Sequence, residues 1–321
     1  MNFSKGRSVK KTVVMILTIL AGMMCMTDLP AAAGEYNANF LYTLSDFSGT
    51  KPFSSARINQ DFAKNEIYAM IGEAVSIFNA SGMEVYRFDY DPTIGIVSDV
   101  AVMSNGQLAI LASKGPLTWL VRCNFRAETL GTINLSGLPS GFANFSPNRI
   151  FSRGGKLYLI SFTAMQVVII DEQGAFIKGV DLAKELGMSD KEREEAGLGG
   201  FAIDRNGGFL FTIPAAARAY LISADGKQRV FGKRGSAPGR FGVVTGIAVD
   251  KDGNILVVDK LRCVVMIFES TNFALLKEFG NRGFKPGNLI GPDDILIDKQ
   301  NRAYVSSLRK RGISVYQLSN K

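Results

Sequence analysis

The chain has 321 residues and a formal net charge of +8, with 37 lysines and arginines against 29 aspartates and glutamates, and it contains no histidine. The absence of histidine excludes Ser-His-Asp catalysis, histidine-assisted thiol chemistry, histidine-bound zinc and covalent c-type haem. Any general base must therefore be a carboxylate, Lys, Tyr or Cys. The mild positive excess fits a solvated surface of mixed charge and requires no special partner.

The first 33 residues have the composition of a secretory signal peptide. Basic residues precede an apolar run over residues 12–26, and Ala31-Ala32-Ala33 gives the small-x-small pattern of a cleavage site. The apolar run is shorter than the roughly 20 residues of a membrane span. We expect residues 1–33 to be a signal peptide. Residues 34–321 should be a single exported domain, periplasmic or on the outer surface, without an integral membrane span after cleavage.

Two alternatives to simple cleavage stay open. One is that the segment is retained as an N-terminal anchor, which the short apolar run disfavours. The other is a lipid on Cys25, which is disfavoured because Met23 and Met24 precede it where small residues are wanted.

The most regular stretch of the chain runs from Phe231 to Gly280, and its pattern restarts at Asn281. A Gly/Pro-rich loop leads into three β-type runs, and a fourth run ends in an aromatic-Gly pair. Weaker copies of the strand pattern begin at Arg57, Ser98, Asn148, Gly199 and Asp293. Six copies of a unit of this length predict an all-β fold, a six-bladed β-propeller of four-stranded antiparallel blades.

The last predicted blade lacks a fourth strand at its C-terminal end. Its third strand, Ile313 to Leu318, comes just before the last residues of the sequence, whereas an unassigned strand lies near the N-terminus at residues 40–49. A blade left open would expose a sheet edge. We therefore expect residues 39–47 to supply the outer strand of the last blade and to close the ring.

A charged segment at residues 181–196 interrupts the repeat between the third and fourth blades. Asp181 to Leu186 is predicted to be helical, and Ser189 with Glu192 forms a capping box that opens a second short helix. The segment is expected to face solvent on a loop side of the ring. Insertions of this kind often carry function, but a tolerated surface decoration explains it equally well.

The stretch from Phe231 to Gly280 resembles the NHL-repeat family. The resemblance is carried by the F-G-x-x-G-x-x-P-G-x-F lead-in, by T-G-I-A-V-D at residues 245–250, and by D-G-N-I-L-V-V-D at residues 252–259. It is strongest over residues 231–318 and fades toward the first blade. It departs from the family pattern after Asp259, because the Asn-His pair usual there is missing. The resemblance implies an exported bacterial six-bladed propeller that serves mainly as a binding surface.

Some propellers of related fold, strictosidine-synthase-like and gluconolactonase-like enzymes, hold a divalent cation in the central channel. Here the first residues of the innermost strands should surround the channel mouth, and Asp99, Asp293, Asp294 and Asn148 offer oxygen ligands for a hard cation such as Ca²⁺. Arg149 projects into the same ring and should face Asp294. A salt bridge or a water network is therefore the competing interpretation, and no other cofactor is expected.

Two further patterns are interpreted as structural. Asp250 to Asn254 looks like the start of a calcium loop, but it lacks the distal Glu and similar residues recur at the same hairpin in other copies, which favours turn geometry. Cys123 and Cys263 lie in predicted strands of different repeats, so we expect buried free thiols and no disulfide.

Basic residues gather in the later loops, and six of them are candidates for a partner-binding face. They are Lys233, Arg234, Arg240, Arg309, Lys310 and Arg311. An acidic protein, a phosphate-bearing glycolipid or a haem-propionate surface would fit them. The alternative is that these charges only keep the inter-blade loops soluble. Nucleic acid is not expected as a partner, because an exported protein rarely meets it.

The sequence predicts an exported, non-enzymatic interaction or scaffold protein, either a monomeric ring or a subunit of a hetero-complex. The chain resembles the exported NHL proteins that are found alongside multihaem cytochromes. A cell-envelope complex with such a cytochrome is therefore one candidate assembly. The alternative is a calcium-assisted hydrolase or lactonase that uses Asp99, Asp293 and Asp294.

Overall fold

The computed structural model describes residues 36–45 and 55–320. The expected signal peptide, its cleavage site and Cys25 lie outside these residues. Among the residues described, no helix is long and apolar enough to cross a membrane.

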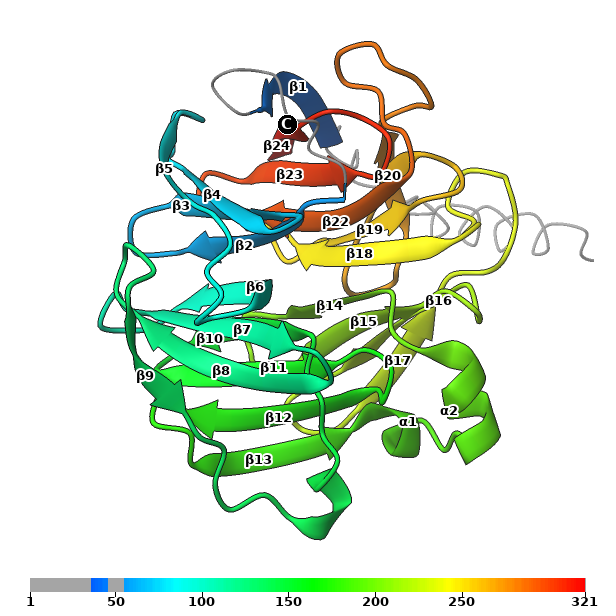
Figure 1. The fold of residues 1–321 in the computed structure, drawn as a ribbon. Helices are drawn as coiled ribbons and strands as arrows, with labels where there is room; N and C mark the ends of the chain where they lie inside the picture. Colours follow the sequence, from blue (N-terminus) through cyan, green and yellow to red (C-terminus); the bar gives the residue numbers. More distant parts are fainter. Residues whose placement is uncertain (1–35, 46–54, 321) are drawn as a thin grey trace, which may run out of the picture. The chain divides into compact units, whose positions relative to one another are not determined.

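Six four-stranded antiparallel sheets follow one another around a central axis, as Figure 1 shows. Blade one contains β2 (Arg57–Asp61), β3 (Glu66–Ile71), β4 (Ala74–Phe78) and β5 (Glu84–Phe88). Blade two contains β6 (Ile96–Val102), β7 (Leu108–Lys114), β8 (Leu117–Cys123) and β9 (Thr129–Ile133). Blade three contains β10 (Arg149–Arg153), β11 (Lys156–Ser161), β12 (Gln166–Asp171) and β13 (Phe176–Asp181).

The second half of the ring is built in the same way. Blade four contains β14 (Gly200–Ile203), β15 (Phe209–Ile213), β16 (Arg218–Ile222) and β17 (Gln228–Phe231). Blade five contains β18 (Val244–Val249), β19 (Ile255–Asp259), β20 (Val264–Phe268) and β21 (Leu275–Phe279). Blade six contains β22 (Pro292–Ile297), β23 (Arg302–Ser307), β24 (Ile313–Asn320) and β1 (Tyr36–Leu44). The innermost strand β22 contacts β2, so the ring is closed, and the predicted six-bladed propeller is confirmed.

The ring is closed by the first strand of the described residues. Strand β1 is the outer strand of blade six and pairs antiparallel with β24, from Tyr36 opposite Asn320 to Leu44 opposite Ile313. This confirms the expected closure, although the strand begins three residues earlier than predicted. The last two residues of the expected range, 46 and 47, lie outside the described part of the chain.

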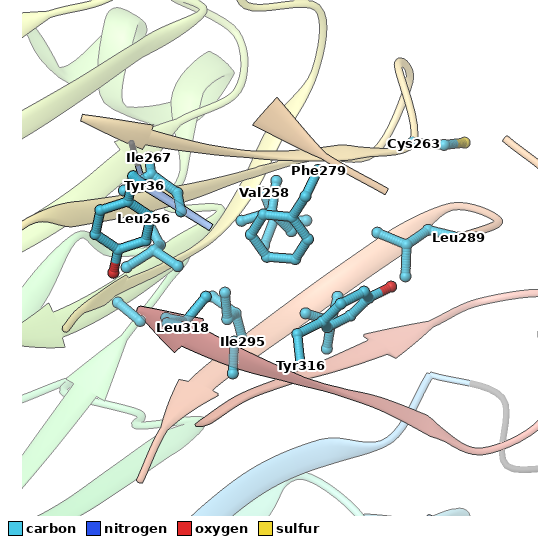
Figure 2. Packing of buried hydrophobic residues seen from close by; sticks show 14 residues of the cluster. Tyr36, Leu256, Val258, Cys263, Ile267, Phe279, Leu289, Ile295, Tyr316 and Leu318 are labelled. Carbon is cyan, nitrogen blue, oxygen red and sulfur yellow. The ribbon is translucent and has the colours of Figure 1, made fainter. Parts of the chain in front are cut away.

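The hydrophobic core lies between neighbouring blades. Strands β19 and β20 are buried along their whole length because sheets pack against both of their faces, and they are correspondingly continuous in apolar residues. One cluster joins Leu256 and Val258 of blade five to Ile295 and Tyr316 of blade six (Figure 2). Burial of each such side chain contributes roughly 1.5–3 kcal/mol, so the blade interfaces hold the ring together.

Three aspartates make the same turn between the first and second strands of blades four, five and six. The carboxylates of Asp204, Asp250 and Asp298 each accept N–H groups from the residues two and four positions ahead, at 2.7 to 2.9 Å. Gly253 has a φ of 90°, a conformation that glycine adopts without strain. The turn interpretation of the Asp250 segment is therefore confirmed.

The insertion after blade three forms α1 (Leu182–Glu185) and α2 (Asp190–Ala196), as predicted. Ser189 and Glu192 make the expected capping box. The segment is not wholly solvent-facing, because Leu182 and Ala183 are buried in the core between blades three and four. The only other helical turn in the described residues is η1 (Ser140–Phe142), in the preceding inter-blade loop.

Both cysteines of the described residues are buried and free, as expected. Cys123 ends β8, but Cys263 lies in the turn before β20 and has a φ of 61°. The prediction that Cys263 lies within a strand is therefore wrong. An apolar residue that precedes an apolar strand continues its pattern, so the turn leaves no mark in the sequence.

Candidate functional site

The two ends of the ring carry different loops. The loops between blades and the turns between second and third strands lie at one end, which we call the crossover face; it includes residues 232–243, 280–291 and 308–312. The turns between first and second strands lie at the other end, the turn face, which includes residues 204–208, 250–254 and 298–301. Each innermost strand therefore starts at the crossover face and ends at the turn face.

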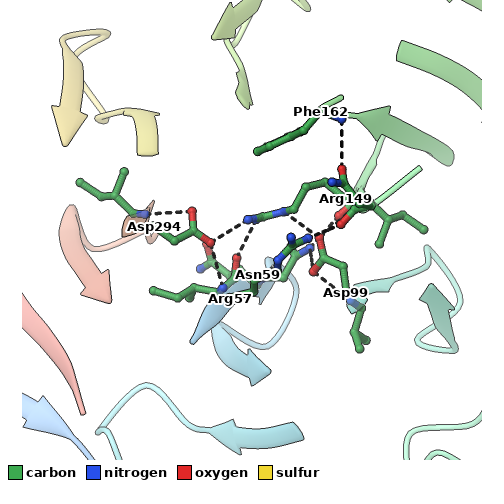
Figure 3. Close-up of polar contacts among 12 residues, drawn as sticks. Arg57, Asn59, Asp99, Arg149, Phe162 and Asp294 are labelled. Carbon is green, nitrogen blue, oxygen red and sulfur yellow. Dashed lines mark hydrogen bonds and ion pairs between the residues drawn. The ribbon is translucent and has the colours of Figure 1, made fainter. Parts of the chain in front are cut away.

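Arg149, at the start of β10, reaches across the channel near the crossover face and is only 6% exposed. Its Nε lies 2.9 Å from Oδ2 of Asp99, and its Nη1 lies 2.8 Å from Oδ2 of Asp294 (Figure 3). The predicted pairing of Arg149 with Asp294 is thus confirmed, and Asp99 is its second partner. One guanidinium joins blades two, three and six.

Blade one completes this network. Arg57 donates to the backbone carbonyl of Asn148, and Asn59 Nδ2 donates to the carbonyl of Ile150 at 2.7 Å. The backbone N–H of Ile58 donates to Asp294 Oδ2 at 3.1 Å. Two arginines and two aspartates therefore balance in charge where the channel meets the crossover face.

The electrostatics of the network follow from its burial. Burial raises the pKa of the Asp99 carboxyl, although Arg149 and the backbone N–H groups of Ile150 and Val100 oppose that shift. Burial alone would lower the pKa of Arg149, but Asp294 and Asp99 raise it above its ordinary value, so the guanidinium stays charged. The pKa of Arg57 is lowered by burial and by repulsion from Arg149.

The four predicted calcium ligands are only partly brought together. Asp99 and Asp294 face the same guanidinium, whereas Asp293 pairs with Lys260 Nζ at 2.9 Å. Asn148 Oδ1 accepts the backbone N–H of Phe162 at 3.1 Å. In the described part of the chain no group of three or more acidic or cysteine side chains is arranged to hold a metal. Calcium binding at this mouth stays a prediction.

Blades four and five contribute glycines to the mouth of the channel because the inner strands of blades four, five and six approach one another closely. A Cβ added to Gly200 would lie 2.5 Å from the carbonyl oxygen of Thr245, and one added to Gly246 would lie 3.1 Å from that of Asp293. A larger side chain with ligand oxygens would separate these strands. The unequal set of residues around the mouth is thus a consequence of packing.

The six predicted partner-binding residues all lie on the crossover face, but one of them is not free. Lys310 is 9% exposed, and its Nζ donates to the carbonyl of Lys285 at 3.0 Å and to that of Asn288. Burial lowers its pKa. Lys310 therefore holds a loop in place. The prediction that it is an exposed partner-binding cation is corrected, because its role is structural. The other five residues are exposed.

The sequence analysis missed two apolar side chains beside these cations. Phe284 is 78% exposed and Leu261 is 56% exposed, on neighbouring loops of blades five and six. Arg282 Nη2 donates to the carbonyl of Leu261 at 2.7 Å, which joins the two loops. We call this surface the crossover patch, and it consists of Leu261, Arg282, Phe284, Lys285, Arg309 and Arg311. The signal in the sequence for this exposed side chain was a phenylalanine that stands between glycine and lysine in a loop.

A cavity at the turn face was also missed. It has a volume of about 780 Å³ and is lined by the ends of the innermost strands of all six blades. The signal in the sequence is a basic residue directly after the turn aspartate in three blades, namely Arg205, Lys251 and Lys299. That register can be recognised only once the turns are aligned in space.

Comparisons with known proteins define the class of fold. A Bacteroides thetaiotaomicron protein of unknown function is 13% identical with a TM-score of 0.60, over 88% of this chain and 72% of that chain. Virginiamycin B lyase from Staphylococcus aureus is 13% identical with a TM-score of 0.51, over 85% and 82%. The WD40 propeller domain of Doa1 is 12% identical with a TM-score of 0.54, over 88% and 97%.

These likenesses show the propeller fold alone. No protein-family model matches the chain, and no curated protein matches it. The six-bladed architecture implied by the NHL resemblance is confirmed by the sheet topology, while membership in the NHL family is not.

Proposed function

We propose that the chain is a non-catalytic binding propeller whose crossover patch engages an acidic protein partner through apolar and electrostatic contacts. The observation that carries this proposal is the pair of exposed side chains Phe284 and Leu261 among cations. Within the described residues none of the four patch cations forms an ion pair. Exposed aromatic anchors beside arginines are typical of interface centres, and the free charges would favour association with a negative surface.

The patch is held in place before any partner arrives. Lys310 ties the loop that carries Phe284 to the β23–β24 hairpin, and the Tyr316 hydroxyl donates to the carbonyl of Gly287 at 2.9 Å. The backbone N–H of Arg309 donates to the carbonyl of Ile290 at 3.3 Å. A surface already ordered loses less conformational entropy on binding, which supports a binding role.

The proposed partner is an acidic protein of the cell envelope. We propose that the protein acts after export, in the cell envelope, where a multihaem cytochrome with exposed propionates has the acidic surface that this patch would recognise. Acidic envelope proteins without haem have the same chemistry and are distinguished by the experiment.

A photocrosslinking amino acid at position 284 tests the proposal in intact cells. We expect it to trap a discrete partner that is acidic, and we expect Arg309→Glu with Arg311→Glu to abolish trapping. The same probe at Phe125 is the control, because Phe125 is 55% exposed beside Arg126 but lies on the turn face between β8 and β9. Equal trapping at both positions, or trapping that survives the charge reversals, would contradict the proposal.

A further inference from the structure

The axial cavity at the turn face has the dimensions of a small-molecule site. Its volume of about 780 Å³ lies within the roughly 300–1,000 Å³ of ligand pockets. All six blades contribute residues to its lining, so it is built into the axis of the ring and is not a gap beneath one loop.

The inner wall of the cavity is apolar. Phe151 and Phe201 line it with ring centroids 6.1 Å apart, and Ile247 and Ile295 line it from blades five and six. The Arg149 guanidinium carbon lies 5.3 Å from the Phe151 ring centroid, so the buried ion-pair network borders this wall. Inside the rim, a ligand that enters from the turn face would meet these hydrophobic side chains, with the ion-pair network behind them.

The rim of the cavity is positively charged. Arg205, Lys251 and Lys299 are exposed in the turns of blades four, five and six, and no ion pair holds them within residues 36–45 and 55–320. Arg153 joins them from blade three and donates to the carbonyls of Ile203 and Arg205 at 3.1 and 2.8 Å.

Among the described residues, the acidic side chains that line the cavity form no ion pair with Arg205, Lys251 or Lys299. Asp61 accepts the backbone N–H groups of Ala63 and Lys64. The Asp250 carboxylate accepts hydrogen bonds from backbone N–H groups of its own turn, from the Asn254 side chain and from the Tyr36 hydroxyl. Asp298 is paired with Arg302 and also accepts from the Tyr304 hydroxyl. The three carboxylates thus have hydrogen-bond or ion-pair partners of their own, and the side chains of the two lysines stay available to a ligand.

We propose that this cavity binds a small amphipathic anion. The apolar body of the ligand would lie against Phe151, Phe201, Ile247 and Ile295, while its carboxylate, sulfate or phosphate head would meet Lys251, Lys299 and Arg205 at the rim. Charge complementarity selects an anion over a neutral amphiphile, because the three cations attract an anionic head and give a neutral head no such attraction. The site lies on the opposite face from the crossover patch, so this function is separate from the partner binding proposed above.

Calorimetric titration of the purified full-length chain with decanoate and with decanol separates the two parts of the proposal. We expect decanoate to bind at least tenfold more tightly than decanol. The variant with Lys251→Glu and Lys299→Glu should bind decanoate at least tenfold more weakly and should bind decanol within about twofold of the parent. Lys233→Glu with Arg240→Glu is the matched control, with the same charge change on exposed residues of the crossover face, and it should leave both affinities unchanged.

A cavity-filling variant tests the apolar part. Ile203 lines the cavity and is only partly buried, so Ile203→Trp should occupy the space and abolish binding of both ligands without loss of the folded state, as checked by the thermal transition. Equal affinity for decanoate and decanol, or an affinity for decanoate that neither the rim reversal nor Ile203→Trp changes, would overturn the proposal. No binding of decanoate at all would overturn it as well.

Discussion

The Arg149 side chain is nearly shielded from solvent where it makes its two ion pairs, and its positive charge stabilises both carboxylates. Asp99 is fully buried, and without the guanidinium its carboxylate would lose the charge that most offsets the cost of its burial. Breaking a buried pair on one side costs far more than replacing the whole pair by apolar groups. The packing of blades two, three and six against one another therefore depends strongly on this network.

We expect Arg149→Met to lower the free energy of unfolding by about 3–5 kcal/mol, measured by urea denaturation. Adding Asp99→Asn and Asp294→Asn to that variant should recover part of the loss, because no uncompensated charge then remains in the channel. Lys299→Met removes an exposed cation and should change stability by less than about 0.5 kcal/mol. A loss below about 1 kcal/mol for Arg149→Met would show that the pairs contribute little.

Cys123 offers a second test at this scale. Burial raises the pKa of its thiol to about 11, above the value of 9.0 expected when the chain is unfolded. The neutral thiol is therefore favoured in the folded state, and the stability linked to it is fully present below pH 9 and is lost as the pH rises through 11.

We therefore expect iodoacetamide at pH 8 to leave Cys123 unmodified in the folded protein and to alkylate it in urea, as read by peptide mapping of that one residue. Cys123→Ser should remove the modified peptide in urea and serves as the control for the assignment. Rapid alkylation of Cys123 without denaturant would contradict the burial described above.

Sequence patterns at the residue scale predict one of the two ion-pair partners of Arg149 but not the other. The pairing of Arg149 with Asp294 follows from the order of blades around the axis, whereas the contact with Asp99 depends on a register shift between Val97 and Asp99 in β6. Bulges of this kind turn side chains away from their alternating positions. They cannot be located from alternation alone, because the sequence pattern assumes that alternation continues.

At the scale of elements, the closure of the ring rests on one strand. The two ends of β1, Tyr36 and Leu44, are buried, while Asn39 and Leu41 in its middle are exposed. Without this strand, β24 would present an unpaired edge that can pair with other chains.

We expect Tyr36→Ala combined with Leu44→Ala to lower the free energy of unfolding by at least about 4 kcal/mol and to produce higher oligomers in size-exclusion chromatography. The matched variant with Asn39→Ala and Leu41→Ala changes two exposed positions of the same strand and should cost less than about 1 kcal/mol. Similar losses for the two variants would mean that β1 is not a necessary part of blade six.

The elements that the sequence predicts well are those repeated several times. The turn aspartates recur in register in blades four to six, and the capping box of Ser189 and Glu192 is a local pattern, so both appear as expected. Cys263 and the early start of β1 were not predicted. Their conformations are set by tertiary packing, and neither a turn residue nor a change of polarity marks them in the chain.

At the scale of the whole molecule, the ring offers two different surfaces. The crossover face is closed on the axis by the Arg149 network and carries the exposed crossover patch, whereas the turn face opens into the apolar cavity. The six-bladed architecture was predictable because it depends on a period. The cavity and the patch were not, because each consists of residues that only the closed ring brings together.

The pairing of β1 with β24 also has a consequence for the time course of folding. The strand that completes the last blade precedes every other described strand in the chain, and its partner β24 follows all of them. The closing contact is therefore of very long range in sequence, which makes closure a late and slow event compared with the hairpins inside each blade. Until it occurs, a nascent chain carries five complete sheets and one with an open edge. During that interval the chain is most exposed to mispairing with another copy of itself.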